Sequence, residues 1–313
     1  MLTSRCAAGS LSRLSVGPGH RNPLANRLFG GHIVPVRHPL TTRAALTLAL
    51  AMSVVASLLG SAGTAVAAAG GTGCVPPPIA HRGDSARAPE NTLPAFRKAL
   101  ALGVRRLELD VRFTVEGTPV LLHDPTVDRT TNGSGEVATM SLADLRALDA
   151  GRWFSRTYAG VKVPTLYEVL ELGRTRGAYF LVELKTRPTQ PQMDAFLNRI
   201  RWLGMLERVR VMSFDEQTVL DVRAAQPGLR TAILDNPSYR SPDSVLLYGT
   251  TYVVHQNSVT EERVARWRAA GIEVRPWTVD RTRAWRRMAS DKVEATITNR
   301  PKRYLSWARS VCS

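Results

Sequence analysis

The second half of the chain alternates regularly between helix-like and strand-like segments, and this alternation is the strongest constraint on its fold. From Leu166 onward, each amphipathic stretch is followed by a short apolar run. Helices are predicted at 166–174, 192–202, 216–225, 242–247, 261–270, 281–289 and 304–310, and strands at 179–184, 209–212, 229–234, 252–254, 272–277 and 295–298. Strands that alternate with helices form a parallel sheet, because parallel neighbours need a long crossover.

Two more strands, at 79–81 and 105–112, are predicted upstream of this region. The helix between them is expected to be capped by Asn91 or Thr92. The run 120–123 follows too closely for a parallel crossover, so it is predicted to return as an antiparallel hairpin strand. Eight strands remain, which predicts an α/β fold, a (β/α)8 TIM barrel with a rim hairpin and an insertion after it.

The insertion covers residues 125–165 and contains Trp153, Phe154 and Tyr158. Connections of this length often form a lid or a substrate wall. A surface flap packed by its own aromatic side chains is an equally good interpretation.

Charged side chains gather where the first three predicted strands end. Glu108 and Asp110 are two residues apart and therefore face the same way, as do Glu183 and Lys185. In TIM barrels the carboxyl ends of the strands form the active site, and the interior is otherwise filled by Val, Ile and Leu. Several inward charges therefore need a ligand to offset their desolvation.

Three carboxylates from adjacent strands suit one hard divalent cation, Ca²⁺ or Mg²⁺, whereas zinc would favour a His/Cys cluster. His81 and His123 end neighbouring segments and can exchange protons near neutral pH, and Arg82 offers a rigid fork for a phosphate. A metal, two proton carriers and an anion clamp predict phosphoester chemistry. Taken singly, His81 could instead be a hydrogen-bonded core residue, and Glu183 with Lys185 a simple ion pair.

Seven short motifs occur in order from about residue 78 to the end of the chain. They are His81-Arg82-Gly83, Pro89-Glu90-Asn91-Thr92, Glu108-Leu109-Asp110, His123-Asp124, Pro164-Thr165-Leu166, Val182-Glu183-Leu184-Lys185 and Trp277-Thr278-Val279. In this order they resemble the glycerophosphodiester phosphodiesterase family of phospholipase C-like barrels. The resemblance implies metal-dependent hydrolysis of glycerophosphodiesters to glycerol 3-phosphate and an alcohol, through a cyclic phosphate intermediate.

The resemblance also implies a role for each site residue. His81 would act as the base and His123 as the acid, with the metal held by the three carboxylates. Arg82 and Lys185 would hold the phosphate, and Trp277 would pack against the glycerol carbons.

Two positions depart from the family pattern. Asn299 replaces the aspartate of the usual closing motif Asp-Gly-Ile-Ile-Thr-Asp-x-Pro, which is expected to alter a local polar contact or headgroup preference away from the metal and histidine positions. In the hairpin, Glu116-Gly117 replaces Asp-Gly and still allows the turn. His255 ends a strand without a matching motif and is predicted to line or support the pocket.

Other functions stay open. One is a related phospholipase-like barrel, such as a sphingomyelinase D-type enzyme or an inositol-phospholipid lyase, although bacterial inositol lyases lack this metal triad. Another is an inactive barrel that binds anionic headgroups or wall polymer. The intact histidines and carboxylates argue against that second alternative.

Residues 1–67 are predicted to be a signal peptide with an over-extended start, 68–77 a linker and 78–313 the catalytic domain. The apolar run 44–59 follows basic residues without a twin arginine, and Ala65-Val66-Ala67 fits a signal peptidase site. A secreted protein using the general secretory route is expected. A transmembrane anchor is the alternative, but the run is short and rich in Ala and Ser.

The whole chain has a formal net charge of +16, and the leader holds six arginines and no acidic residue. A basic surface favours anionic partners such as headgroups or wall polymer, although an Arg-rich solvated face explains most of the charge equally simply. There is no zinc-finger spacing or compact basic run, so nucleic acid is not expected. A monomer acting on a small-molecule substrate is predicted.

Two cysteines remain after the leader, Cys74 and Cys312, and an even pair in an exported protein predicts a disulfide. A closed barrel brings its ends together, which permits the bond. A lipid-anchored Cys74 is the alternative, but Gly71-Thr72-Gly73 before it lies far from the apolar run and lacks a leucine.

Overall fold

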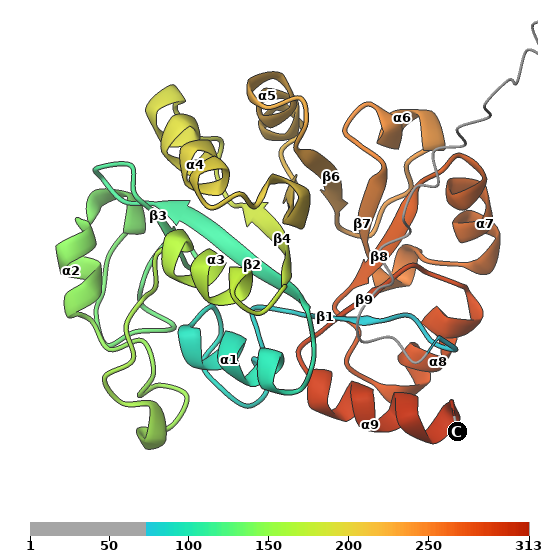
Figure 1. Ribbon diagram of the computed structural model, residues 1–313, viewed down its shortest axis with the longest axis horizontal. Coiled ribbons are helices and arrows are strands. Elements are labelled where there is room, and N and C mark those ends of the chain that lie inside the picture. Colours follow the sequence, from blue (N-terminus) through green and yellow to red (C-terminus); the bar gives the residue numbers. More distant parts are fainter. Residues whose placement is uncertain (1–72, 313) are drawn as a thin grey trace, which may run out of the picture. The chain divides into compact units, whose positions relative to one another are not determined.

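The computed structural model describes residues 73–312, which form a parallel barrel surrounded by helices (Figure 1). Within these residues, eight parallel strands pair in the order β8-β7-β6-β5-β4-β2-β1-β9. Their bounds are β1 Pro78–Ala80, β2 Arg106–Phe113, β4 Tyr179–Leu184, β5 Val209–Ser213, β6 Arg230–Asp235, β7 Thr251–His255, β8 Glu273–Trp277 and β9 Thr296–Thr298. The predicted barrel and its strand count are confirmed.

The barrel closes between β8 and β9, which contact each other without a regular ladder. Backbone hydrogen bonds flank this seam: Val279 N donates to Ile297 O at 2.9 Å, and Glu294 N donates to Val274 O at 3.1 Å. The barrel is therefore nearly closed.

The helices cover the outside of the barrel and follow the predicted alternation (Figure 1). Their bounds are α1 Leu93–Ala101, α2 Leu142–Ala147, α3 Leu166–Arg174, α4 Gln190–Trp202, α5 Glu216–Ala225, α6 Pro242–Leu246, α7 Glu261–Ala269, α8 Thr282–Ser290 and α9 Pro301–Val311. Single 3-10 turns lie at Val137–Thr139, Arg156–Tyr158, Leu206–Arg208 and Gln256–Ser258. Among these helices, none is long and apolar enough to cross a membrane.

The expected hairpin is present. β3 (Pro119–Leu121) pairs antiparallel with β2, with Val111 opposite Leu121. Gly117 adopts φ +83° in the turn, a conformation that glycine accepts without strain. The hairpin therefore delivers His123 from the rim while leaving the barrel's strand order undisturbed.

The insertion packs as a surface flap. Its apolar side chains form a separate small cluster with the hairpin, which includes Val127, Val137 and Leu145. Phe154 makes edge contacts with Trp153 and Tyr158, and the Tyr158 hydroxyl donates to Arg87 O at 2.6 Å. None of the three aromatics lines the pocket described below. In this respect the structure favours the flap over the substrate wall.

Apolar side chains fill the middle of the barrel lumen, because alternate strand residues point inward. This central layer comprises Ile79, Leu181, Met212, Ala232, Leu234, Val253, Ala295 and Ile297. Larger clusters lie between the strands and the helices. Charged residues are therefore confined to the two ends of the lumen.

The expected cap of α1 is wrong. Thr92 precedes the helix, but no side-chain hydrogen bond caps it. The Thr92 hydroxyl donates instead to Pro89 O at 2.5 Å, and the Asn91 side chain turns to Asp110. For Asn91, the buried carboxylate of Asp110 is a stronger hydrogen-bond partner than the helix end.

The two ends of the described domain meet. Cys74 and Cys312 form the predicted disulfide, with their Cα atoms 5.8 Å apart. Next to it, the Tyr304 hydroxyl donates to Pro76 O at 2.5 Å. The predicted signal peptide at 1–67 and the first half of the predicted linker lie outside the described residues.

Candidate active site

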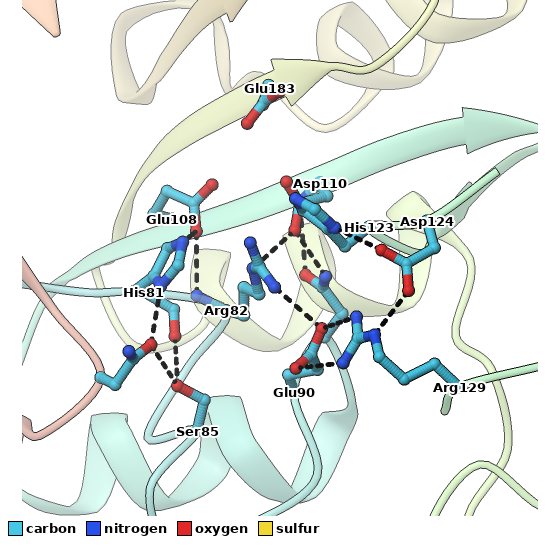
Figure 2. Close-up of polar contacts among 12 residues, drawn as sticks. His81, Arg82, Ser85, Glu90, Glu108, Asp110, His123, Asp124, Arg129 and Glu183 are labelled. Atoms are coloured by element: carbon cyan, nitrogen blue, oxygen red, sulfur yellow. Dashed lines mark hydrogen bonds and ion pairs between the residues drawn. The ribbon is translucent and has the colours of Figure 1, made fainter. Parts of the chain in front are cut away.

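Three carboxylates meet at the carboxyl end of the barrel. Glu108 and Asp110 come from β2 and Glu183 from β4, and Asp110 is paired with Glu183 in the strand register. One oxygen from each lies within 4.8 Å of the others (Figure 2). All three are buried, with exposed fractions of 1%, 0% and 6%. The predicted metal ligands therefore converge as expected.

The charges of this triad are not balanced by the described protein groups alone. Burial, and then the neighbouring Asp110, raises the pKa of Glu108 well above its usual value and that of Glu183 to about 7. Burial also acts to raise the pKa of Asp110, but Arg82 and Lys185 hold it below its usual value. Such a set of competing carboxylates is relieved by a shared cation.

Two of the carboxylate oxygens have no hydrogen-bond partner among the described residues, namely Glu108 Oε1 and Asp110 Oδ1. Buried oxygens of this kind are costly unless they are paired or coordinate a metal. Hard oxygen donors are what Ca²⁺ and Mg²⁺ prefer. The triad therefore fits a divalent cation.

The loop after β1 holds the other oxygens in place. Arg82 adopts φ +54°, which turns its backbone N–H toward Glu108 Oε2 at 2.9 Å and its Nε to 3.0 Å from Asp110 Oδ2. The next residue, Gly83, has φ +86°, and a Cβ there would lie 2.6 Å from the Ala95 carbonyl carbon. The turn that presents Arg82 therefore requires glycine.

Asn91 fixes the central carboxylate from two sides. It also has a positive φ of +55°. Its Nδ2 donates to Asp110 Oδ2 at 2.8 Å, and its Oδ1 accepts from the Asp110 backbone N at 3.2 Å. Lys185 approaches the other oxygen of Asp110, with Nζ 3.6 Å from Oδ1, and lies 2.6 Å from Glu183 Oε1. Each predicted ligand is thus positioned by a dedicated polar neighbour.

Asn299 fixes the tautomer of the His81 ring. Asn299 Nδ2 donates to Asp280 Oδ2 at 2.7 Å, and because a carboxylate only accepts, this contact turns Asn299 Oδ1 toward His81 Nδ1, 2.7 Å away. Nδ1 therefore carries the proton and Nε2 is left with its lone pair. Burial and the adjacent Arg82 lower the pKa of His81 to about 4, so the ring is neutral at physiological pH.

His123 is oriented differently, by a carboxylate. Its Nδ1 lies 2.6 Å from Asp124 Oδ1, and Arg129 Nε donates to the other oxygen of Asp124 at 2.5 Å. Arg112 fixes the backbone by donating to His123 O at 2.7 and 3.0 Å. Burial lowers the pKa of His123, and Asp110 and Asp124 act against this change by stabilising the protonated ring.

A chain of charged groups joins the two halves of the site (Figure 2). Arg82 Nη1 donates to Glu90 Oε1 at 2.9 Å, and Arg129 Nη2 donates to the same oxygen at 2.7 Å. Since Arg129 also holds Asp124, the loop after β1, the hairpin and the start of the insertion are tied together. Arg82 and His123 are therefore positioned by one network.

The site opens into a pocket of about 80 Å³ with one polar and one apolar wall. The predicted residues His81, Arg82, His123, Lys185 and Trp277 all line it. The apolar wall also contains Phe214, whose ring centroid lies 5.7 Å from that of Trp277 in an edge contact.

Trp277 is held in place by the strands beside it. Its Nε1 donates to Asp235 O at 3.1 Å, and the His255 ring packs edge-on at 5.3 Å between centroids. His255 is not among the lining residues, so it supports the pocket through Trp277.

The sequence from residue 81 to 303 matches the model of the glycerophosphoryl diester phosphodiesterase family. The chain belongs to this family. A glycerophosphodiester phosphodiesterase of Caldanaerobacter subterraneus subsp. tengcongensis is 36% identical over 235 residues, covering 74% of this chain and 97% of the relative. One from Bacillus subtilis is 33% identical over 244 residues, covering 71% and 83%.

Solved structures of similar proteins support the same family assignment. A putative glycerophosphoryl diester phosphodiesterase from Silicibacter pomeroyi superposes with a TM-score of 0.69 at 30% identity, covering 76% of this chain and 94% of the other. An Oleispira antarctica phosphodiesterase, solved with the product sn-glycerol-3-phosphate, gives 0.68 at 27% identity, covering 75% and 97%. The chain is an enzyme that hydrolyses glycerophosphodiesters, as the motifs predict.

One expectation about this phosphodiesterase is wrong. The sequence predicts that Asn299 lies away from the metal and histidine positions, but it contacts His81 directly. The two residues are 218 positions apart in the sequence and are brought together by barrel closure, since β1 pairs with β9. An amide at this position supplies a neutral acceptor to the imidazole where the family motif has a carboxylate.

Other supporting residues were not recognised in the sequence. The sequence predicts Asn91 to be a helix cap and indicates no function for Glu90, Asp124, Arg129 or Phe214. Glu90, Asn91 and Asp124 lie within the seven motifs, so the motifs draw attention to their positions. Their partners, however, lie in other segments and depend on the tertiary structure.

Proposed function

We propose that this phosphodiesterase requires one divalent cation, Ca²⁺ or Mg²⁺, held by Glu108, Asp110 and Glu183. When bound, such a cation polarises a phosphate oxygen and stabilises negative charge that develops on phosphorus. Arg82 and Lys185 would hold the remaining phosphate oxygens from the pocket wall, while the ring of Trp277 would pack against the glycerol carbons. The buried, competing carboxylates are the main support for this assignment.

His81 would act as the general base. Its proton is on Nδ1, held by Asn299, so Nε2 can accept the proton of the glycerol 2-hydroxyl. The hydroxyl oxygen would then attack phosphorus and displace the alcohol, giving a cyclic glycerol phosphate. A base with a pKa of about 4 is fully available at neutral pH.

His123 would act as the general acid and give its proton to the departing alcohol. Asp124 accepts from Nδ1 and stabilises the protonated ring, a support that Asn299 does not offer to His81. In the second half of the reaction, water would open the cyclic phosphate with the two histidine roles reversed, which restores both rings. Glycerol 3-phosphate is the product.

We also propose that the enzyme is exported through the general secretory route. The basic and apolar leader motivates this proposal, and the Cys74–Cys312 disulfide suits an oxidising compartment. Wall polymer or a membrane surface would then be an accessible anionic partner. Mass spectrometry of the N-terminus of protein recovered from the culture medium tests it, since an intact Met1 or a strictly cell-bound protein would contradict export.

The observation that carries the catalytic proposal is the meeting of a carboxylate triad and two differently supported histidines in one pocket. The test is release of glycerol 3-phosphate from a panel of choline, ethanolamine and glycerol phosphodiesters, with and without chelator and added Ca²⁺ or Mg²⁺. We expect activity that the chelator abolishes and the cation restores. Detection of the cyclic phosphate in early time points would support the intermediate.

Two outcomes would count against the proposal. Chelator-resistant turnover would remove the metal role. Activity confined to sphingomyelin or lysophospholipid would assign the enzyme to a sphingomyelinase D-type reaction.

A further inference from the structure

The barrel lumen has a second polar end, opposite the active site. Strand alternation that points Glu108, Met212 and Trp277 into the lumen also points inward the residues two positions earlier, Arg106, Arg210 and Arg275. They lie toward the amino-terminal ends of the strands. A cavity of about 250 Å³ opens there.

This cavity is strongly basic. Five arginines line it against two glutamates, which leaves an excess of three positive charges; the arginines are Arg106, Arg208, Arg210, Arg230 and Arg275. Its floor includes Ile79 and Leu181, members of the apolar layer in the middle of the barrel. Other members of that layer, among them Met212 and Leu234, face the active-site pocket. The two cavities are therefore separated by packed apolar side chains.

The buried arginines of this cavity are only partly paired. Arg210 is 6% exposed, and its Nη1 donates to Glu273 Oε2 at 2.5 Å. Arg275 Nη2 donates to the same oxygen at 2.6 Å. The Nε atoms of both arginines are buried and have no hydrogen-bond partner among the described residues. Two guanidinium groups thus share one carboxylate oxygen.

The pKa values of two arginines in this cavity are also lowered, as expected where positive charges are buried with too few anions beside them. Burial, followed by repulsion from Arg210, lowers the pKa of Arg275 to about 10. Burial also lowers the pKa of Arg106. Buried donors and like charges of this kind are stabilised when an anion enters and accepts their hydrogen bonds.

We propose that this amino-terminal cavity, named here the basal cavity, binds a small phosphate-bearing anion. Guanidinium forks match the geometry of phosphate oxygens, and an excess of three charges favours a multiply charged ligand over a simple carboxylate. The volume admits a phosphomonoester or a diphosphate. Because the apolar layer separates the two sites, this ligand binds independently of the catalytic reaction.

The test is calorimetric titration of the oxidised, mature protein with inorganic phosphate, pyrophosphate and sn-glycerol 3-phosphate in turn, in the presence of EDTA. The chelator keeps divalent cations away from pyrophosphate and from the triad. We expect one equivalent of at least one of these anions to bind per chain. The preferred anion distinguishes a phosphomonoester site from a diphosphate site.

Variants then locate the binding. Arg210→Gln and Arg106→Gln should each weaken anion binding at least tenfold. The Arg106→Gln variant is the decisive test if Arg210→Gln does not fold. Arg266→Gln, on the exposed face of α7, is the matched control for loss of one surface charge. Lys185→Met controls for binding in the active site. Both controls should bind as the unmodified protein does.

The proposal is overturned by the absence of saturable binding of all three anions. It is equally overturned when Lys185→Met loses binding and Arg106→Gln keeps it, since the anion then occupies the active site. An equal loss in Arg266→Gln would mean that the anion responds only to the overall charge.

Discussion

The contact between Asn299 and His81 makes the pH dependence of this enzyme sensitive to a single amide. Asn299→Asp keeps the shape of the side chain and replaces a neutral acceptor by a carboxylate 2.7 Å from Nδ1. A negative charge there stabilises the protonated imidazole and so raises the pKa of His81. Since the base must be unprotonated, activity should be lost at a higher pH than in the unmodified enzyme.

The size of the shift follows from two opposing interactions. Opposite charges about 4 Å apart at an effective dielectric constant of about 20 attract by about 4 kcal/mol, or about 3 pKa units. Asp280 reduces this shift, because its Oδ2 lies 2.7 Å from the atom that would become the second carboxylate oxygen, and two carboxylates this close share a proton and carry less negative charge. Partial protonation of the carboxylate pair should reduce the shift in the pKa of His81 to about 1–2 units. From about 4, the pKa of His81 would rise to about 5–6.

The assay is kcat/KM against pH, which reports the ionisation of the free enzyme. In Asn299→Asp the acid limb should move upward by about 1–2 pH units, with a tenfold loss of rate per unit below the raised pKa. A bound cation lowers the pKa of His81 in both proteins, so the difference between them is the quantity to measure. Asn198→Asp, on the exposed side of α4, is the matched control. An acid limb that stays in place, or moves to lower pH, would refute the reasoning.

The remaining predictions concern catalysis, the metal and stability. His81→Ala and His123→Ala should each lower kcat by about two orders of magnitude or more, as general acid–base groups do, and near-normal turnover in a folded variant would contradict the proposed roles. Glu108→Gln should abolish activation by added Ca²⁺ or Mg²⁺, measured as activity against cation concentration after chelation; an unchanged activation curve would place the ion elsewhere. Replacing both Cys74 and Cys312 by Ser opens a loop that spans 238 positions. In the chain-entropy model the loss of stability is up to about 5 kcal/mol, measured by denaturant unfolding, and no change would show that the bond adds nothing.

The alternation of helix-like and strand-like segments was sufficient to predict the barrel, and the two-residue period of its strands was sufficient to predict that the carboxylates face one site. Side chains two positions apart on a strand share a face whatever the surroundings, because the extended backbone of L-residues alternates. Glu108 with Asp110, and Glu183 with Lys185, could therefore be paired from the sequence. The short link before β3 excluded a parallel crossover for the same kind of local reason.

Contacts between distant segments were decided by the tertiary structure alone. Asn299 reaches His81 because β9 pairs with β1, and Arg129 joins Glu90 to Asp124 because the hairpin returns over the barrel. The basal cavity likewise exists because four strands and one 3-10 turn bring arginines to one end of the lumen. Periodicity states which way a side chain points, whereas its partner depends on strand register and barrel closure, which are set by packing over the whole domain.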